Sequence, residues 1–309
     1  MGWLDFITNL GRIVRAIATD QIAWLMPALY VRLTGQTGRG EDVGVGLTAD
    51  YFRGCFEDYF QELGVAEADV PAYLHDKQVL EYGPGDMPAV ALLMVAYGAR
   101  SVMCVDRFPL LRLSPQNIEV LKQLVVNLPA AQRARAEQCF VTPGEPDSGF
   151  RPACIAYRVT HSGLSGLTDW ADLIVSRAVL EHVNDLTATF ADMHAALRPG
   201  AMAIHLVDLR SHGLHQHNPL DFLRWPPLLW RWMYGHKGVP NRWRVDRYRA
   251  VLQTSGLETL ALRPVAVLEQ ALVAAARPSL ARPFRHLNDQ DLSWLNFWLV
   301  CRKPPLTTP

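Results

Sequence analysis

Two different periods of hydrophobic and polar residues divide the chain. In the first part, to about residue 70, aromatic side chains recur three and four positions apart, as at Phe52, Phe56 and Phe60, which is typical of one apolar helix face. From residue 78 onward, short apolar runs alternate with longer apolar or amphipathic segments. We predict helices over 87–97, 117–126, 185–197 and 246–254, and strands over 78–82, 101–106, 153–159, 172–176, 202–208, 257–268 and 296–301.

This alternation predicts right-handed βαβ units, and therefore a parallel sheet with helices on both faces. The alternation breaks over 211–243, which contains four of the nine tryptophans and three of the ten histidines within six positions. We interpret this stretch as a mobile lid over an acceptor pocket. The sequence therefore predicts four parts: an N-terminal helical extension (1–70), an α/β core (71–210), a lid and substrate segment (211–245) and a C-terminal completion of the sheet (246–309).

Composition narrows the class of protein. Lys+Arg and Asp+Glu both number 30, so the chain lacks the basic excess that is typical of nucleic-acid binders. The stretch 13–31 is fairly apolar, but Arg15, Asp20 and Pro27 interrupt it, and no membrane span is predicted. The start of the chain lacks the pattern of a signal peptide. Because the five cysteines lie far apart with no metal-ligand or CxxC spacing, we expect reduced thiols and a cytoplasmic protein.

The sharpest chemical signal is the turn after the first predicted strand, Glu81–Asp86, followed by Asp106 at the end of the second. Two glycines let a ligand lie against the main chain, and an acidic residue about 20 positions later suits a ribose diol. A dinucleotide-dependent oxidoreductase would use the same geometry. However, Pro88 replaces its third glycine, and the carboxylates of Glu81 and Asp86 would repel a diphosphate. They suit a ligand that carries an ammonium and a sulfonium group.

The chain resembles the class I family of S-adenosylmethionine (SAM)-dependent methyltransferases over roughly residues 77–210, and more loosely to about 302. The resemblance rests on Glu81–Gly85, on Asp172–Val183, on Leu197–Gly200 and on Asn241–Arg244, with Ala201 in place of one family glycine. It implies a seven-stranded Rossmann-like sheet whose last strand is antiparallel. It also implies SAM as cofactor, held by the loops after the first four strands.

By position, the resemblance assigns a set of residues to the methionine, ribose and adenine parts of SAM. His161 departs from the family pattern, because many relatives have an aspartate near this place. The cofactor-binding residues implied are Glu81, Tyr82, Gly83, Pro84, Gly85, Asp106, Arg107, His161, Ser162, Ser176 and Arg177.

The expected reaction is methyl transfer to a small molecule, such as a secondary metabolite, a sugar or a lipid-like acceptor. Candidates for the group that takes up the acceptor's proton are His182, Asp208 and His212, which follow the fourth and fifth strands. Candidate substrate-binding residues are His215, His217, Trp225, Trp230 and Arg242. No metal is expected, since no nearby Cys or Glu completes a ligand set with the three clustered histidines.

Other readings of the sequence stay open. Methylation of nucleobase amines is disfavoured, because Ser176–Val179 lacks the Asn/Asp-Pro-Pro-aromatic motif. A SAM-binding regulatory protein without turnover is one alternative, and the dinucleotide-dependent oxidoreductase is another. Exposed aromatic side chains of 212–243 would also allow peripheral contact with a membrane.

Overall fold

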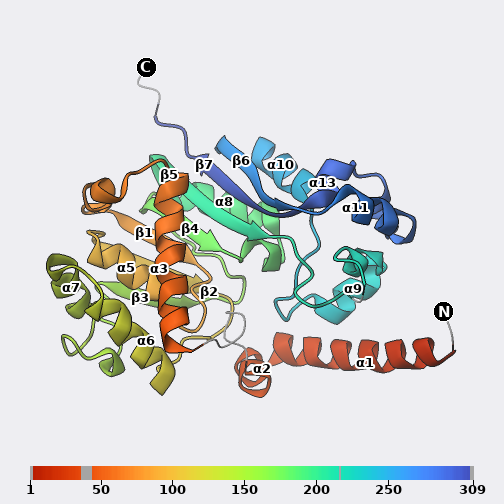
Figure 1. Ribbon diagram of the computed structural model, residues 1–309, viewed down its shortest axis with the longest axis horizontal. Helices are drawn as coiled ribbons and strands as arrows, with labels where there is room; N and C mark the ends of the chain where they lie inside the picture. The colour runs from red at the N-terminus through yellow and green to blue at the C-terminus, as the bar shows by residue number, and fades with distance from the viewer. Residues whose placement is uncertain (1–2, 36–43, 216, 307–309) are drawn as a thin grey trace.

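Seven strands form one sheet in the order β3-β2-β1-β4-β5-β7-β6 (Figure 1). The structure is a computed structural model that describes residues 3–35, 44–215 and 217–306. The first five strands are parallel in their pairings, whereas β7 is antiparallel to β5 and to β6, which confirms the predicted fold class. The strands are β1 (Gln78–Tyr82), β2 (Ser101–Asp106), β3 (Ile155–Val159), β4 (Ala171–Arg177), β5 (Leu197–Asp208), β6 (Glu258–Val267) and β7 (Trp294–Arg302).

The central strands are buried on both faces, because their consecutive apolar residues point into two different cores. Leu173 and Val175 of β4 belong to one core, and the intervening Ile174 belongs to the other. Such uninterrupted apolar runs are typical of parallel strands covered by helices on both sides. The first core includes side chains from α3 (Val45–Glu62), α5 (Ala89–Ala96), α6 (Pro115–Val126) and α7 (Ala130–Glu137), and the second includes side chains from α8 (Leu186–Ala196) and α10 (Val245–Thr254).

Several short helices lie outside the predicted pattern. They contain four to eight residues and lack a long apolar period of their own, so their stability comes from tertiary packing. These short helices are α2 (Pro27–Thr34), α4 (Val70–Leu74), α9 (Pro227–Tyr234), α11 (Gln270–Ala276), α12 (Arg282–Arg285) and α13 (Asp289–Ser293). The first helix, α1, is long and spans Trp3–Leu25. Short 3₁₀ helices span Glu67–Asp69, Pro146–Ser148, Leu180–His182, Asp221–Arg224 and Arg277–Ser279.

The N-terminal helices confirm the predicted helical extension where it is described; residues 1–2 and 36–43 lie outside the described residues. Helix α3 packs on α5 and α6, whereas α1 lies apart from the sheet, beside α9 (Figure 1). Among the described residues, no helix has the length and apolar character needed to cross a membrane.

Strand β5 begins at Leu197, five residues before the predicted strand over 202–208. Leu197 pairs with Ala171 of β4, and Gly200 N–H donates to the carbonyl of Lys303. Contacts with distant segments therefore extend this strand beyond its apolar run.

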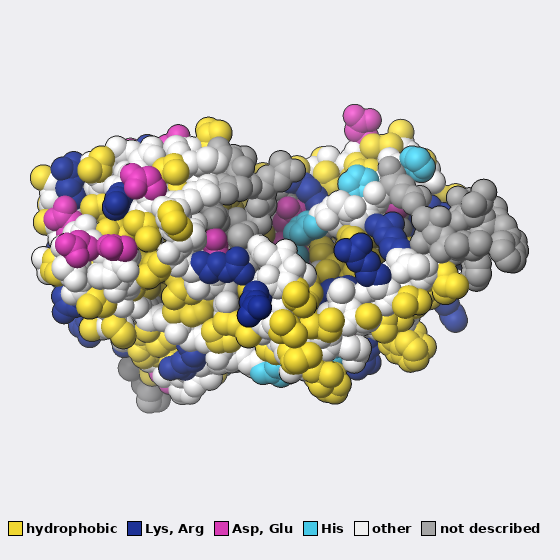
Figure 2. All heavy atoms as spheres, turned by 90° about the horizontal axis from the view of Figure 1, so that it is seen from below, with side chains coloured by type: hydrophobic (Ala, Val, Ile, Leu, Met, Phe, Trp, Pro, Cys, Tyr) yellow, Lys and Arg dark blue, Asp and Glu magenta, His cyan; other side chains and the backbone are white. Residues whose placement is uncertain are grey.

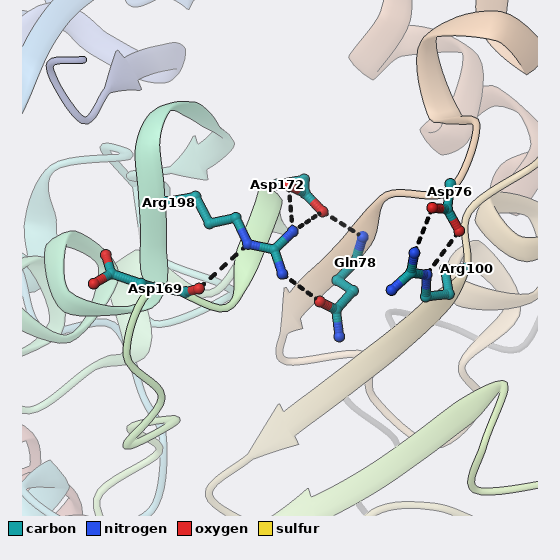
Figure 3. A network of polar contacts seen from close by, with 6 residues as sticks. All are labelled: Asp76, Gln78, Arg100, Asp169, Asp172 and Arg198. Atoms are coloured by element: carbon teal, nitrogen blue, oxygen red, sulfur yellow. Dashed lines mark hydrogen bonds and ion pairs between the residues drawn. The ribbon is translucent and has the colours of Figure 1, made fainter. Parts of the chain in front are cut away.

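A polar network joins β1, β4 and β5 at the end of the sheet opposite to the glycine turn (Figure 3). Arg198 donates to both oxygens of Asp172 at 2.7 Å and to Gln78 Oε1 at 2.6 Å. The backbone N–H of Gln78 donates to Asp172 in turn, at 2.8 Å. Arg198 belongs to the motif at the start of β5 on which the family resemblance rests. Because its guanidinium bonds to β1 and β4, it holds the three strands together at the end of the sheet away from the glycine turn.

Candidate functional site

The glycine turn after β1 has a backbone that favours glycine at two positions and leaves no room for a side chain at Gly83. Gly83 and Gly85 have φ of 65° and 73°. A Cβ atom on Gly83 would lie 2.4 Å from Cγ2 of Val179, in the loop after β4. The loops after β1 and β4 are therefore in direct contact, which places the residues that follow Val179 beside the glycine turn.

Two buried carboxylates, Glu81 and Asp106, lie at the carboxyl ends of β1 and β2. Burial raises the pKa of Glu81 to about 7 and that of Asp106 to about 6. Glu81 contacts the Cys104 thiol at 3.6 Å, and Asp106 accepts from the backbone N–H of Phe108 at 3.0 Å. A ligand that brings a positive charge and hydroxyl donors would stabilise the ionised forms. These carboxylates fit SAM chemically, and the contacts of Glu81 with the methionine end and of Asp106 with the ribose stay predictions.

Helix α3 adds residues to this site that the sequence analysis missed. Asp58 accepts from Arg177 Nη1 at 2.8 Å, and the Arg177 guanidinium lies 5.9 Å from the ring centre of Tyr51. Arg177 follows β4 and remains partly exposed. It stays a candidate for the methionine carboxylate. The one sequence signal was Asp58 itself, an acidic residue among the aromatic positions of a helix interpreted only as core.

Two predicted cofactor residues have side chains that are already paired in the interior. The Tyr82 hydroxyl donates to Asp192 on α8. Ser176 Oγ lies 2.7 Å from Nδ1 of His205 on β5, and both residues are buried. Breaking such buried hydrogen bonds is costly, so a cofactor contact would have to come from the main chain at these two positions. Pro84 lies between the two turn glycines, and its contact stays a prediction.

The N-terminal helices α1 and α2 lie beside His161, at the predicted adenine edge of the site. A cavity of about 20 Å³ lies between this predicted edge and the two helices. Arg107 is held there by Asn184 Oδ1 at 2.6 Å. Exposed Ser162 closes a local turn, accepting from Leu164 N–H at 3.3 Å. The cavity is lined by Ala23, Trp24, Pro27, Arg107, Phe108, His161, Asn184 and His236. It holds about one water molecule.

Buried polar contacts link α1 to the segment 211–245. Lys237 Nζ donates to the carbonyl of Ala16 and to Thr19 Oγ1, both at 2.7 Å. Asp20 accepts from the backbone N–H groups of His236 and Lys237, at 2.9 and 3.2 Å. We call α1, α2 and residues 211–245 together the cover.

The three predicted catalytic candidates converge at the carboxyl ends of β4 and β5. His212 Nε2 lies 3.7 Å from Asp208 Oδ2, and the rings of His182 and His212 meet edge to face with centres 4.9 Å apart. Burial lowers the pKa of His182 to about 3 and also lowers that of His212. Both imidazoles are therefore uncharged near neutral pH.

Glu181 completes this polar cluster, and sequence reasoning did not include it. Its side chain is fully buried, neither carboxylate oxygen has a well-formed hydrogen bond, and burial raises its pKa well above the usual value. Ligand atoms of Glu181, His182 and His212 lie within 4.8 Å of one another, a spacing that a metal ion could bridge. The expected absence of a metal stays a prediction.

The other two clustered histidines point to local partners. His215 bonds to Ser211, and the backbone N–H of His217 donates to Asp221 at 3.0 Å. Both side chains are exposed, and their contact with a substrate stays a prediction.

Trp230 and Arg242 pack against each other inside the cover and donate hydrogen bonds to its main chain. Trp230 is buried, and its indole N–H donates to the carbonyl of Pro240 at 3.2 Å. Arg242 donates to the carbonyl of Trp225 at 2.7 Å, and its guanidinium lies 4.5 Å from the centre of the Trp230 ring. The structure therefore shows packing for these three residues, and a substrate contact stays a prediction.

Comparisons with known proteins agree with this arrangement. A family model described as "Methyltransferase domain" matches residues 58–262. No curated protein sequence matches the chain.

Solved structures with a similar arrangement include a putative sarcosine dimethylglycine methyltransferase from Galdieria sulphuraria, which is 17% identical. Its TM-score is 0.44, over 89% of this chain and 97% of that one. Another is a SAM-dependent methyltransferase from Mesorhizobium loti, which is 16% identical with a TM-score of 0.41, over 77% and 98% of the two chains.

The family match covers more than half of the chain and includes the glycine turn, Asp106 and the motif after β4. The chain belongs to the methyltransferase domain family, in its class I form that uses SAM as cofactor.

Proposed function

We propose that the protein transfers a methyl group from SAM to a small-molecule acceptor whose nucleophilic atom faces Asp208 and His212. One observation carries the proposal. His182 follows β4, Asp208 ends β5 and His212 follows it, and the three meet at the edge of the sheet where Val179 touches the glycine turn. In open α/β sheets, ligand groups gather at this edge.

Bound SAM supplies a methyl group on a sulfonium, which is already activated for in-line displacement. The protein therefore has to position the acceptor and take up its proton. His212 is uncharged near neutral pH and can accept a proton from an acceptor hydroxyl or amine. The carboxylate of Asp208, 3.7 Å from Nε2, would stabilise the imidazolium that results. His182 stays neutral and holds the His212 ring through the edge contact.

The net charge of zero supports a small acceptor over nucleic acid. A secondary metabolite, a sugar or a lipid-like molecule fits this description. Among the described residues all five cysteines are free thiols, which supports the cytoplasm as the proposed compartment. We retain the four parts 1–70, 71–210, 211–245 and 246–309 as the proposed domain organisation.

The experiment has two stages. Calorimetry with SAM, S-adenosylhomocysteine and NAD separates a methyltransferase from a dinucleotide-dependent oxidoreductase. A panel of candidate acceptors is then screened for release of S-adenosylhomocysteine. With an acceptor in hand, His212→Ala should lower kcat by about 10²–10⁴-fold, whereas the control His286→Ala, at an exposed position outside the cover, should leave it unchanged.

SAM binding without turnover of any acceptor would support the regulatory alternative. Equal turnover by wild type and His212→Ala would remove His212 from the proposed role.

A further inference from the structure

Large hydrophobic side chains are exposed along the first two helices. They are Leu10, Val14, Leu25, Met26, Leu29 and Leu33, and Leu25 and Leu33 are 65% and 66% exposed. On α1, Leu10, Val14 and Leu25 recur at helical spacing on the side opposite to the buried Ala16 and Ala23.

Helix α9, which packs against α1, also has exposed apolar side chains. Leu228 and Trp232 are 67% and 59% exposed, and Trp24 is also exposed. We call these exposed side chains of α1, α2 and α9 the N-terminal apolar face. Figure 2 looks at the molecule from this side and shows hydrophobic side chains gathered along its lower part, with Lys or Arg between them.

The charges around the N-terminal apolar face are mainly positive. The three helices contain Arg12, Arg15, Arg32 and Arg231 against Asp5 and Asp20. Asp20 is buried and holds the loop at His236, so it does not offset the arginines at the surface. An apolar stripe beside arginines is typical of helices that lie in the interface of an anionic bilayer, where arginine binds lipid phosphates and tryptophan sits at the headgroup level.

We propose that the N-terminal apolar face docks on an anionic phospholipid bilayer, with α1 lying in the plane of the headgroups. The face has no other partner among the described residues, and its exposed apolar area favours transfer out of water. A second copy of the chain is a poorer occupant, because a symmetric contact would bring arginines against arginines. Trp24 and Pro27 also line the cavity at the adenine edge, so docking would take place beside the cofactor site.

The test uses the full chain and vesicles, without any turnover, so its outcome is independent of the proposed methyl transfer. Co-sedimentation is measured with phosphatidylcholine vesicles and with vesicles that also contain phosphatidylglycerol. Leu10→Glu/Leu25→Glu should weaken partitioning onto the anionic vesicles by about tenfold, since two apolar contacts are lost and two negative charges are added. Arg12→Glu/Arg15→Glu should weaken it in a salt-dependent way. The matched control Leu260→Glu/Val265→Glu changes exposed side chains of β6 and should bind like wild type.

A second measurement does not depend on inserted charge. Tryptophan emission should shift to the blue with anionic vesicles, and the shift should shrink in Trp24→Phe/Trp232→Phe. The proposal is overturned if the wild type stays in the supernatant, or if the β6 control loses binding equally. It is also overturned if light scattering shows a dimer that Leu10→Glu/Leu25→Glu dissociates while vesicle binding is absent.

Discussion

The cofactor edge of the sheet and the cover are built in different ways. At the cofactor edge, backbone conformation and short loops place the groups: two glycines with positive φ, and two carboxylates directly at or after strand ends. In the cover, contacts between residues more than 200 positions apart place the groups, as between Lys237 and Ala16. The comparison teaches that the glycine turn depends mainly on local backbone conformation, whereas the cover depends on contacts between distant segments.

The largest expected effect is at the glycine turn. Gly83→Val should abolish SAM binding in calorimetry, because its Cβ would meet Val179 at 2.4 Å in a backbone conformation that disfavours side chains. Gly85→Val should do the same. Gly64→Val is the matched control, since Gly64 also has positive φ but open space around it. If Gly83→Val bound SAM as Gly64→Val does, the turn would not contact the cofactor. Loss of cooperative melting would make both turn glycines structural.

The next effect is on stability against pH. Burial raises the pKa of Glu81 from 4.5 to about 7, so the folded state favours its protonated form. Without SAM, stability should therefore fall as pH rises from 4.5 through 7, by up to about 3 kcal/mol. Glu81→Gln should remove this decrease, measured by urea unfolding between pH 5 and 8.5, and should also weaken SAM binding. The exposed Glu67→Gln serves as control. An unchanged pH profile in Glu81→Gln would show that Glu81 is ionised without cost.

At the ribose position, Asp106→Ala should weaken SAM binding by ~1.5–3 kcal/mol, because a charge-assisted pair of hydrogen bonds is lost. Calorimetry measures the change, and Asp147→Ala, at an exposed turn, is the control. Equal affinities of wild type and Asp106→Ala would remove Asp106 from the site.

A smaller effect concerns the cover. Lys237→Met removes the ammonium that donates to Ala16 and Thr19 and should lower the free energy of unfolding by about 1 kcal/mol. Hydrogen exchange should then become faster in both α1 and residues 212–243. In the wild type, S-adenosylhomocysteine plus acceptor should slow exchange over 212–243. A segment that is fully protected in the empty protein, and unchanged by ligands, would be core and no lid.

The smallest effect is expected from metal removal. Burial raises the pKa of Glu181 well above its usual value, which disfavours the ionised carboxylate that metal binding requires. Turnover should therefore be unchanged after dialysis against a chelator. Stoichiometric metal that survives purification, and that His182→Ala loses, would show instead that the polar cluster is a metal centre.

The sequence by itself determined the order of the strands along the chain and the position of the glycine turn. Strands β1 and β2 have the predicted bounds, because a buried parallel strand is a short apolar run and its end is marked by glycine or aspartate. The candidates His182, Asp208 and His212 also follow from order alone, since residues after parallel strands share one edge of the sheet.

Only the tertiary structure decided which of these groups are available. Tyr82 and Ser176 lie in the predicted motifs, yet Asp192 and His205 occupy their hydroxyls, and no local pattern shows that pairing. Contacts between distant segments also place Glu181 in the polar cluster and bring α1 and α2 to the predicted adenine edge. Such contacts depend on side-chain packing across the assembled fold, whereas helical and strand periods report only which face of an element is buried.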